Sequence, residues 1–278
     1  MDILQYTFFQ NALLGILLIS VIGAIIGTYI VTRRMVFIAG GITHASFGGL
    51  GIGYFLGISP TLSAMVFAIL SAFGVEWLSK GKRVREDSAI AVFWALGMAI
   101  GIIFIFLTPG YTPGLTEFLF GNILTITHKD IFLYALFALV LTVFFLLFYK
   151  PILYTTFDSD FARTQGIRTN VINMCMTLFI AISVVLSIRL VGIMLLISLL
   201  TMPQMIAEMF CQRYKAMIGL SGIISVLCGS IGLVISTFIN VPTGASIVCT
   251  LVAVYTVAKI RNKLLTEKRR REILTERQ

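Results

Sequence analysis

The sequence predicts an all-α, polytopic integral membrane protein with about nine transmembrane helices. Hydrophobic residues make up 58% of its 278 residues and charged residues only 12%, and the mean hydropathy is +1.00. The apolar residues gather in stretches of about 17–25 residues, the length that crosses a bilayer as a helix. A soluble domain of this size would leave much of that apolar surface in water, which makes one large soluble helical domain the weaker alternative.

Nine apolar segments are expected to be the spans. They lie at residues 8–32, 35–57, 60–79, 88–108, 130–149, 172–188, 190–209, 215–238 and 242–261. The sixth and seventh are separated only around Ser187–Arg189, so eight spans is the alternative count. We prefer a tight extracellular turn there, because Arg189 would be costly in lipid.

The basic residues predict the orientation. Nearly all of the 21 Lys and Arg residues fall on alternate connections and in the C-terminal segment, whereas only Lys129 and Arg189 fall on the other side. Basic residues are enriched in cytoplasmic loops, so we expect the N-terminus outside and the C-terminus in the cytoplasm. The expected organisation is a single transmembrane domain over 1–263 and a basic cytoplasmic tail over 264–278.

The net charge of +9 has a membrane explanation. The basic residues form short clusters between apolar segments, where they are expected to face anionic membrane lipid. The sequence has no basic patch interleaved with aromatic residues, so a nucleic-acid partner is not predicted. The four cysteines lack CxxC spacing, which argues against a disulfide framework or a thiolate metal site. The first ten residues lack the basic region and the cleavage site of a signal peptide, so the first segment is expected to be a retained span.

The second segment carries a histidine at membrane depth. Counted from Met35, His44 lies roughly 13–14 Å into a core about 30 Å thick, so its side chain should face protein or a hydrated cavity. Ala45, Gly49 and Gly53 form a small-xxx-small face that lets another helix come close. Imidazole suits Zn²⁺ and, less tightly, Fe²⁺ and Mn²⁺. His44 is either a transient metal ligand or a buried histidine that orders packing or gating.

The seventh segment contains a proline, Pro203, which frees a backbone carbonyl near Leu199. Thr201 and Gln204 would add oxygen ligands along an ion pathway, or hydrogen bonds between helices. The interrupted helix either lines a cavity or is a packing kink. The methionines that follow at helical spacing indicate packing more than copper binding.

The connection over 109–129 is expected on the outer side and is apolar enough to include a short re-entrant or interfacial helix. Glu117, His128 and Asp130 lie in or beside it, and Asn240 lies on another outer connection. These four residues either receive an ion at an outer mouth or are solvated turn residues.

The connection over 150–171 is expected on the cytoplasmic side. Asp158 or Ser159 can cap a short helix there, and Gly166 can supply its left-handed stop. About two turns of helix are therefore expected between the fifth and sixth spans, either as a simple connector or as a rigid knob that docks into a partner.

Five motifs in order along the chain resemble those of the permeases of zinc, manganese and iron ABC importers. They are GGITHASFGG at 40–49, LFGN at 119–122, DSDFARTQG at 158–166, RLVGIMLLISLLTMP at 189–203 and VPTGASIV at 241–248. The similarity covers residues 8–260. One departure concerns Gly40, since members of this family often carry an aspartate four residues before the histidine.

The resemblance implies a homodimeric permease that transports a divalent metal, with zinc first and manganese or iron next, and that holds no permanently bound cofactor. It further implies a coupling helix at about 156–167, through which a separate ATPase subunit docks on Asp158, Asp160, Phe161, Ala162 and Gly166. An extracytoplasmic metal-binding protein would deliver the ion.

No catalytic residues are predicted. The sequence has no GxxxxGK[ST] phosphate-binding loop, so ATP would be hydrolysed by the partner. The alternatives are a secondary transporter driven by an ion gradient, a permease of the same superfamily for a metal chelate, and a membrane assembly protein without a substrate.

Overall fold

The computed structural model describes residues 6–79, 84–110, 121, 123 and 126–275, apart from the side chains of Arg189 and of residues 268–275. Nine helical segments within these residues are long and apolar enough to cross a membrane, which confirms the predicted number of spans. The helices are α1 (Thr7–Thr32), α2 (Val36–Leu56), α3 (Pro60–Ser79), α4 (Glu86–Leu107), α6 (His128–Leu147), α7 (Tyr149–Phe157), α8 (Ser159–Thr164), α9 (Thr169–Phe210), α10 (Tyr214–Ile239) and α11 (Thr243–Thr275).

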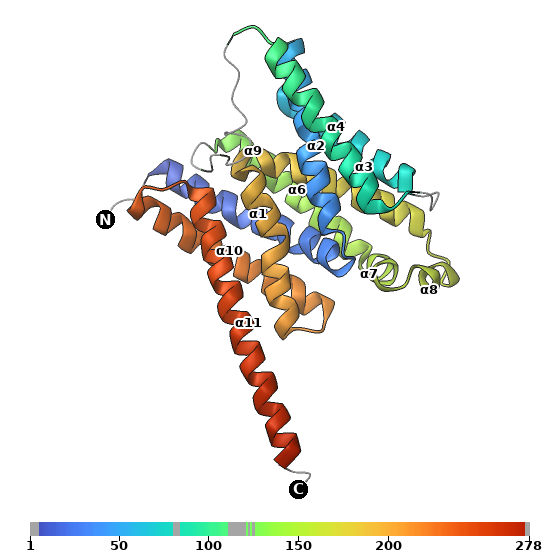
Figure 1. The fold of residues 1–278 in the computed structure, drawn as a ribbon, viewed down its shortest axis with the longest axis vertical. Helices are drawn as coiled ribbons and strands as arrows, with labels where there is room; N and C mark the ends of the chain where they lie inside the picture. Colours follow the sequence, from blue (N-terminus) through green and yellow to red (C-terminus); the bar gives the residue numbers. More distant parts are fainter. Residues whose placement is uncertain (1–5, 80–83, 111–120, 122, 124–125, 276–278) are drawn as a thin grey trace.

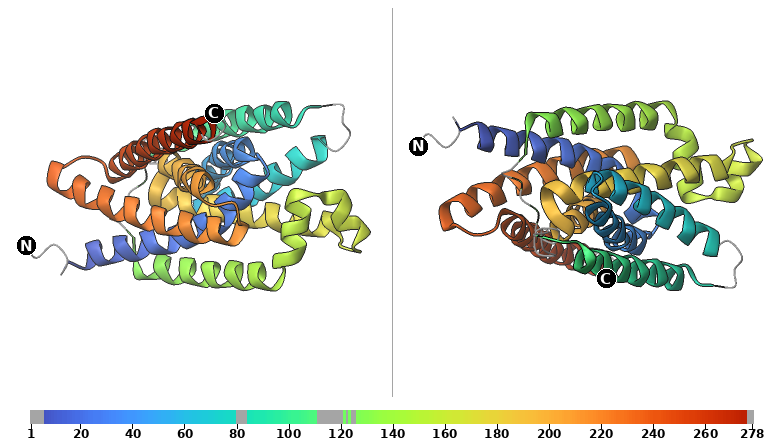
Figure 2. Two further views of the ribbon diagram at one scale, coloured as in Figure 1. Left: turned by 90° about the horizontal axis from the view of Figure 1, so that it is seen from below. Right: turned by 90° about the horizontal axis from the view of Figure 1, so that it is seen from above.

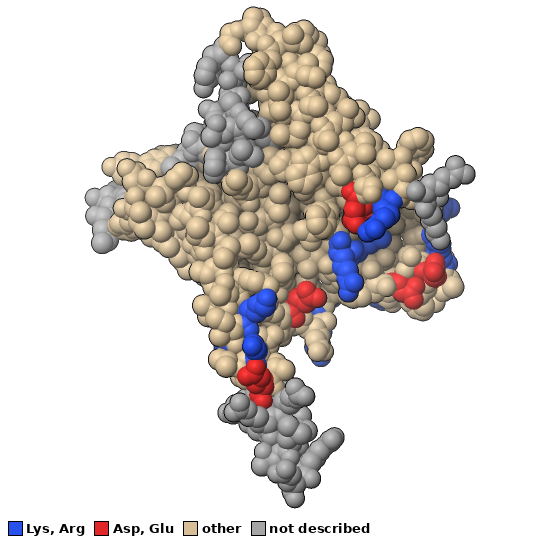
Figure 3. Space-filling model, in the orientation of Figure 1, with Lys and Arg blue, Asp and Glu red and all other residues tan. Residues whose placement is uncertain are grey.

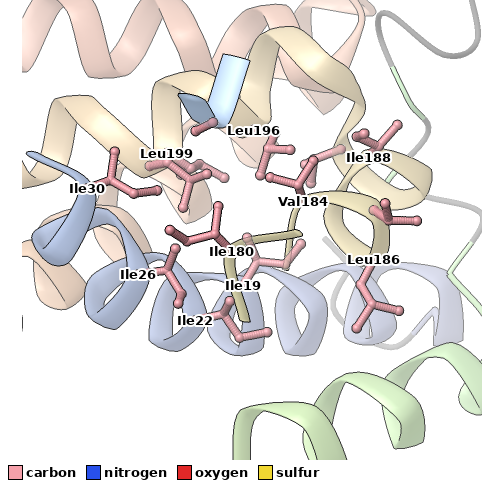
Figure 4. Close-up of a cluster of buried hydrophobic side chains, with 14 of the residues drawn as sticks. Ile19, Ile22, Ile26, Ile30, Ile180, Val184, Leu186, Ile188, Leu196 and Leu199 are labelled. Carbon is pink, nitrogen blue, oxygen red and sulfur yellow. The ribbon is translucent and has the colours of Figure 1, made fainter. Parts of the chain in front are cut away.

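Helix α9 is the central element of the bundle, because α1, α2, α3, α10 and α11 all pack against it. Helices α2, α3 and α4 form one group, whereas α6 and α10 lie on either side of α1 (Figures 1 and 2). The core between α1 and α9 consists of branched aliphatic side chains (Figure 4). Its members include Ile19, Ile22, Ile26 and Ile30 of α1 and Ile180, Val184, Leu196 and Leu199 of α9.

The break between the sixth and seventh spans lies at Gly192, where φ is 71° and ψ is 172° inside α9. The turn expected around Ser187–Arg189 was therefore placed wrongly, since the chain is helical there. Only glycine adopts this backbone region readily. A Cβ atom on Gly121 would collide with the backbone of Val191 and Gly192, so the glycine of the LFGN motif packs directly against the break.

The connection between α4 and α6 is described only in part. The re-entrant helix expected within 109–129 falls largely on residues 111–120, 122, 124 and 125, which lie outside the described residues. Ile123 and Ile126 are buried, and the Asn11 side-chain amide donates a hydrogen bond of 3.1 Å to the Ile126 carbonyl. The end of this connection is thus tied to α1.

Charged side chains on the face shown in Figure 3 gather in its lower right half, over the part of the molecule that holds α7, α8 and α11. The rest of that face is apolar or uncharged where it is described. This distribution matches a membrane protein with one charge-rich end, and the cytoplasmic assignment of that end stays a prediction. Helix α11 continues through the expected boundary at 263/264 as far as Thr275.

Replacement of Gly192 by alanine is expected to destabilise the bundle by about 1–3 kcal/mol, because its φ and ψ are unfavourable for any residue with a Cβ atom. Gly219→Ala is the matched control, since Gly219 lies within helix α10 and a Cβ atom there would meet nothing within 4 Å. Thermal unfolding in detergent measures both. Equal melting temperatures for the two variants would contradict the assignment of the break.

Candidate functional site

Helix α2, which carries His44, is enclosed by unusually close neighbours. A Cβ atom on Gly53 would lie 2.7 Å from the Pro60 Cα atom of α3, and one on Gly49 would collide with the Ser63 carbonyl. The small-xxx-small face predicted in this helix is confirmed for these two glycines. Ala45, the third member of that face, packs instead on α4, where a Cβ atom on Gly97 would lie 2.5 Å from the Ala45 Cα atom.

The approach between α2 and α4 depends on a second glycine pair that the sequence analysis missed. A Cβ atom on Gly48 would lie 2.9 Å from the Gly97 carbonyl oxygen, and one on Gly51 would lie 2.5 Å from that of Gly101. Gly97 and Gly101 are four residues apart in the sequence, so the same small-xxx-small spacing could have identified them. Both neighbours of α2 are thus within backbone contact distance.

The His44 side chain packs against α4. This agrees with the expectation that an ionisable group at membrane depth faces protein, because exposure of such a group to lipid is costly. Its imidazole stacks on the Trp94 indole with ring centroids 4.1 Å apart and an interplanar angle of 7°. The His44 Nδ1 atom is buried and has no hydrogen-bond partner among the described residues. A ring held by stacking, with an unpartnered nitrogen, can bind an ion and release it again.

The surroundings of His44 leave room for additional ligands but supply few. A Cβ atom on Gly40, one turn before His44, would meet only the Ile197 Cδ1 atom, at 3.9 Å. Within the described residues, no group of three or more His, Cys, Asp or Glu side chains could hold a metal ion. A single imidazole nitrogen of this kind fits transient contact with an ion.

Thr201 and Gln204 lie on the second half of α9, and Gln204 contacts α1. The Gln204 side-chain amide is fully buried and donates a hydrogen bond of 2.8 Å to the Gly23 carbonyl, and Thr201 donates one of 2.8 Å to the Ile197 carbonyl. Within the part of the chain that the structure describes, the Gln204 Oε1 atom has no hydrogen-bond partner. These two residues contact α1 and α9, whereas His44 contacts α4, so no described contact joins the three candidate metal residues.

The charge-rich end carries the predicted docking segment. The Asp158 carboxylate caps α8 by accepting hydrogen bonds from the backbone N–H groups of Asp160 (3.0 Å) and Phe161 (2.9 Å). Gly166 has a φ of 75°, and the Ile167 N–H donates to the Ala162 carbonyl across this turn. The predicted cap and stop are both confirmed.

Helix α8 is shorter than the segment expected at about 156–167, because α7 ends at Phe157 and Asp158 separates the two helices. Within α8, Ala162 is buried, whereas Phe161 is 47% exposed and the Asp160 side chain is solvated beside Arg163. The exposed side of α8 therefore presents an aromatic ring between charged groups, which suits a protein contact.

A hydrogen-bond network missed by the sequence analysis ties the first turns of α9 to α1. The Arg33 guanidinium donates to the Tyr29 hydroxyl (2.6 Å) and to the Asn173 side-chain oxygen (2.7 Å). In the sequence, Arg33 is one of the basic residues that predict the orientation, and nothing there pairs it with a residue 140 positions away. The network fixes the part of α9 that directly follows α8.

The residues predicted for the outer mouth are not all brought together. Asn240 ends α10 in a left-handed conformation and lines a pocket of about 420 Å³ between the ends of α1, α10 and α11. His128 begins α6, and Asp130 accepts hydrogen bonds from the Thr127 N–H and hydroxyl in a capping box. Neither lines the Asn240 pocket, and Glu117 lies outside the described residues.

Comparison with known proteins gives a consistent picture. The sequence model of the ABC 3 transport family matches residues 5–262. The chain is 37% identical to an uncharacterized membrane protein of Synechocystis (92% of this chain, 91% of the relative) and 30% identical to the manganese transport system membrane protein MntC of Halalkalibacterium halodurans (92% and 88%). It also resembles the structure of PsaBC from Streptococcus pneumoniae in complex with Fab, with 27% identity, a TM-score of 0.83 and 92% of both chains covered.

Replacement of Gly27 by alanine is expected to destabilise the contact between α1 and α9 by about 1–3 kcal/mol, because the new methyl group would lie 2.6 Å from the Leu200 carbonyl oxygen. Gly23→Ala, one turn earlier on α1, is the control, since its methyl group would lie 3.5 Å from the Leu199 oxygen. Melting temperatures in detergent compare the two. A larger loss in the Gly23 variant would show that the interface is assigned wrongly.

Proposed function

Since this chain belongs to the ABC 3 transport family and is a multi-pass permease subunit of a metal ABC importer, we propose that it carries a divalent first-row metal ion past His44. The observation that carries the proposal is the buried His44 Nδ1 atom, which lies in a helix enclosed by glycine contacts and has no hydrogen-bond partner among the residues that the structure describes. A permeating ion needs contacts that are favourable enough for entry and weak enough for release.

Zinc and manganese are the two candidate cargoes, and different observations favour them. Neutral imidazole is a better ligand for Zn²⁺ than for Mn²⁺, so His44 favours zinc. Relatives in Halalkalibacterium and Listeria are named manganese transport system membrane proteins, which favours manganese. The uptake of Zn²⁺ and of Mn²⁺ is therefore measured separately, each with and without competing Fe²⁺. The ion that is taken up faster and is displaced less by iron is the cargo.

Energy would come from a separate ATPase subunit that docks on α8 at Asp158–Gly166. The capped helix is rigid at its start, and its glycine stop leads within three residues into α9. Because Arg33 joins this end of α9 to α1, a displacement of α8 would reach both helices. An extracytoplasmic binding protein would deliver the ion at the opposite end, near Asn240, and two copies of the permease would form the transport unit.

A gradient-driven secondary transporter is the weaker alternative. Such a protein needs ionisable carboxylates within the membrane to bind protons or coupling ions. In the candidate spans that the structure describes, Asp and Glu lie only in the first or last turn of a span, as with Glu76, Asp130 and Glu208. The described helices thus offer no carboxylate at the depth of His44.

His44→Ala is expected to lower metal uptake by roughly tenfold or more, because even a residue that only supports a ligand contributes about 10- to 100-fold to metal affinity. Co-purification of the ATPase subunit should be unchanged, since His44 packs on Trp94 of α4 rather than on α8. Uptake by whole cells across a series of divalent metals measures the effect. Wild-type uptake of every metal would remove His44 from the pathway.

Gly166→Val is expected to uncouple transport, because a β-branched residue at a φ of 75° is strained and would disrupt the end of α8. ATP hydrolysis should persist while metal uptake falls. Gly57→Val is the matched control, since Gly57 ends α2 with a φ of 68° and has equally open surroundings. Loss of uptake in both variants to the same extent would mean that strain alone, rather than the position of α8, causes the defect.

A further inference from the structure

Helices α6 and α10 leave a groove between them on the surface of the bundle. Both pack on α1, which lies between them in the two views of Figure 2. The groove encloses about 600 Å³ and is lined by ten residues from α1, α6, α7 and α10. We call it the α6–α10 groove.

The part of the α6–α10 groove that lies within the candidate spans is lined by apolar side chains and by Thr142, whose hydroxyl donates a hydrogen bond to the Ala138 carbonyl. Ile25 of α1 contributes to the lining together with Phe145 of α6 and Ile218 of α10, all three inside helices long enough to cross the membrane. A water-soluble protein cannot reach this depth, whereas a lipid acyl chain is already there. An acyl chain of the surrounding bilayer can therefore lie in this part of the groove.

The other end of the groove is cationic and lies where two spans end. The α6 span ends at Leu147 and the α10 span begins at Tyr214, so Lys150 lies just beyond one span and Lys215 in the first turn of the other, where side chains reach the level of lipid headgroups. Both lysine side chains line the groove, and both residues are exposed. Two positive charges therefore lie at one end of the α6–α10 groove.

The charge at this end is not neutralised within the described part of the chain. Neither Lys150 nor Lys215 forms an ion pair there, and the Lys215 ammonium instead lies over the Tyr149 ring, 4.7 Å from its centroid. By contrast, Arg163 and Lys263 each have a carboxylate partner. Two ammonium groups that have no carboxylate partner among the described residues, beside the apolar part of the α6–α10 groove, complement a ligand with an anionic head and a hydrocarbon tail.

We propose that the α6–α10 groove binds an anionic phospholipid. The phosphate lies between Lys150 and Lys215, and an acyl chain follows Ile25, Phe145 and Ile218 along the wall of α1. Because α7 leads from this groove directly to Asp158, the bound lipid contacts the helix that precedes α8. This site does not depend on which metal is transported, nor on whether His44 touches it.

The test uses the full-length permease, purified in detergent together with its ATPase subunit. Native mass spectrometry measures binding of phosphatidylglycerol and phosphatidylcholine to the wild type and to the double variant Lys150→Ala/Lys215→Ala. The wild type should prefer phosphatidylglycerol. The double variant should bind it about 30-fold more weakly, the effect of two cations that face a headgroup, and Lys150→Arg/Lys215→Arg should retain binding.

The matched control is Lys259→Ala/Lys263→Ala on α11. It removes the same charge, and Lys259 also lies over a tyrosine ring, that of Tyr255, at 5.8 Å. This control variant should bind phosphatidylglycerol as the wild type does. A further variant, Ile218→Trp, fills the apolar part of the α6–α10 groove and should weaken the binding of phosphatidylglycerol.

Equal binding of phosphatidylglycerol by the wild type and the Lys150/Lys215 variant would overturn the proposal, as would an equal loss in the Lys259/Lys263 control. If glycerol phosphate at the same concentration displaced phosphatidylglycerol completely, the site would bind only the headgroup and no acyl chain. This result would also overturn the proposal. Loss of the ATPase subunit or of a second permease copy in the Lys150/Lys215 variant, with lipid binding intact, would assign these lysines to a protein contact.

Discussion

Backbone-to-backbone contact between helices is the constraint on which this structure depends. In lipid there is little hydrophobic force between helices, so they associate by close packing and by hydrogen bonds. Gly49, Gly53, Gly97 and Gly101 let α2 lie directly against α3 and α4, and Gly27 does the same between α1 and α9. A single methyl group at most of these positions would push two helices apart. The position of His44 is therefore set by glycines rather than by polar contacts.

The two ends of the proposed mechanism are connected through α9. Its first turns follow α8 and are held to α1 by Arg33 and Asn173, whereas its second half is held to α1 by Gln204. Gly192 separates the halves with a backbone conformation that only glycine adopts readily. A movement that begins at α8 thus has a continuous path of packed elements, and the lipid proposed in the α6–α10 groove would lie beside its origin.

Hydropathy predicted the spans to within a few residues because nine stretches of the required length are separated by polar or charged residues. The cap at Asp158 and the stop at Gly166 were also predictable, since both depend on local chemistry. The break at Gly192 was misplaced by a few residues, because Arg189 was the stronger local signal. The His44–Trp94 stack and the Arg33–Asn173 bond join residues far apart in sequence, which no local pattern reveals.

The central claim is that α8 lies on the cytoplasmic face and receives energy there. Labelling by a membrane-impermeant maleimide tests it directly, in a chain whose four cysteines are replaced by serine. Gln165→Cys places a thiol beside Gly166, and Ser59→Cys places one between α2 and α3; both positions are exposed. The account predicts that intact cells label only the Ser59 variant and inverted vesicles only the Gln165 variant. Labelling of the Gln165 variant on intact cells would contradict it.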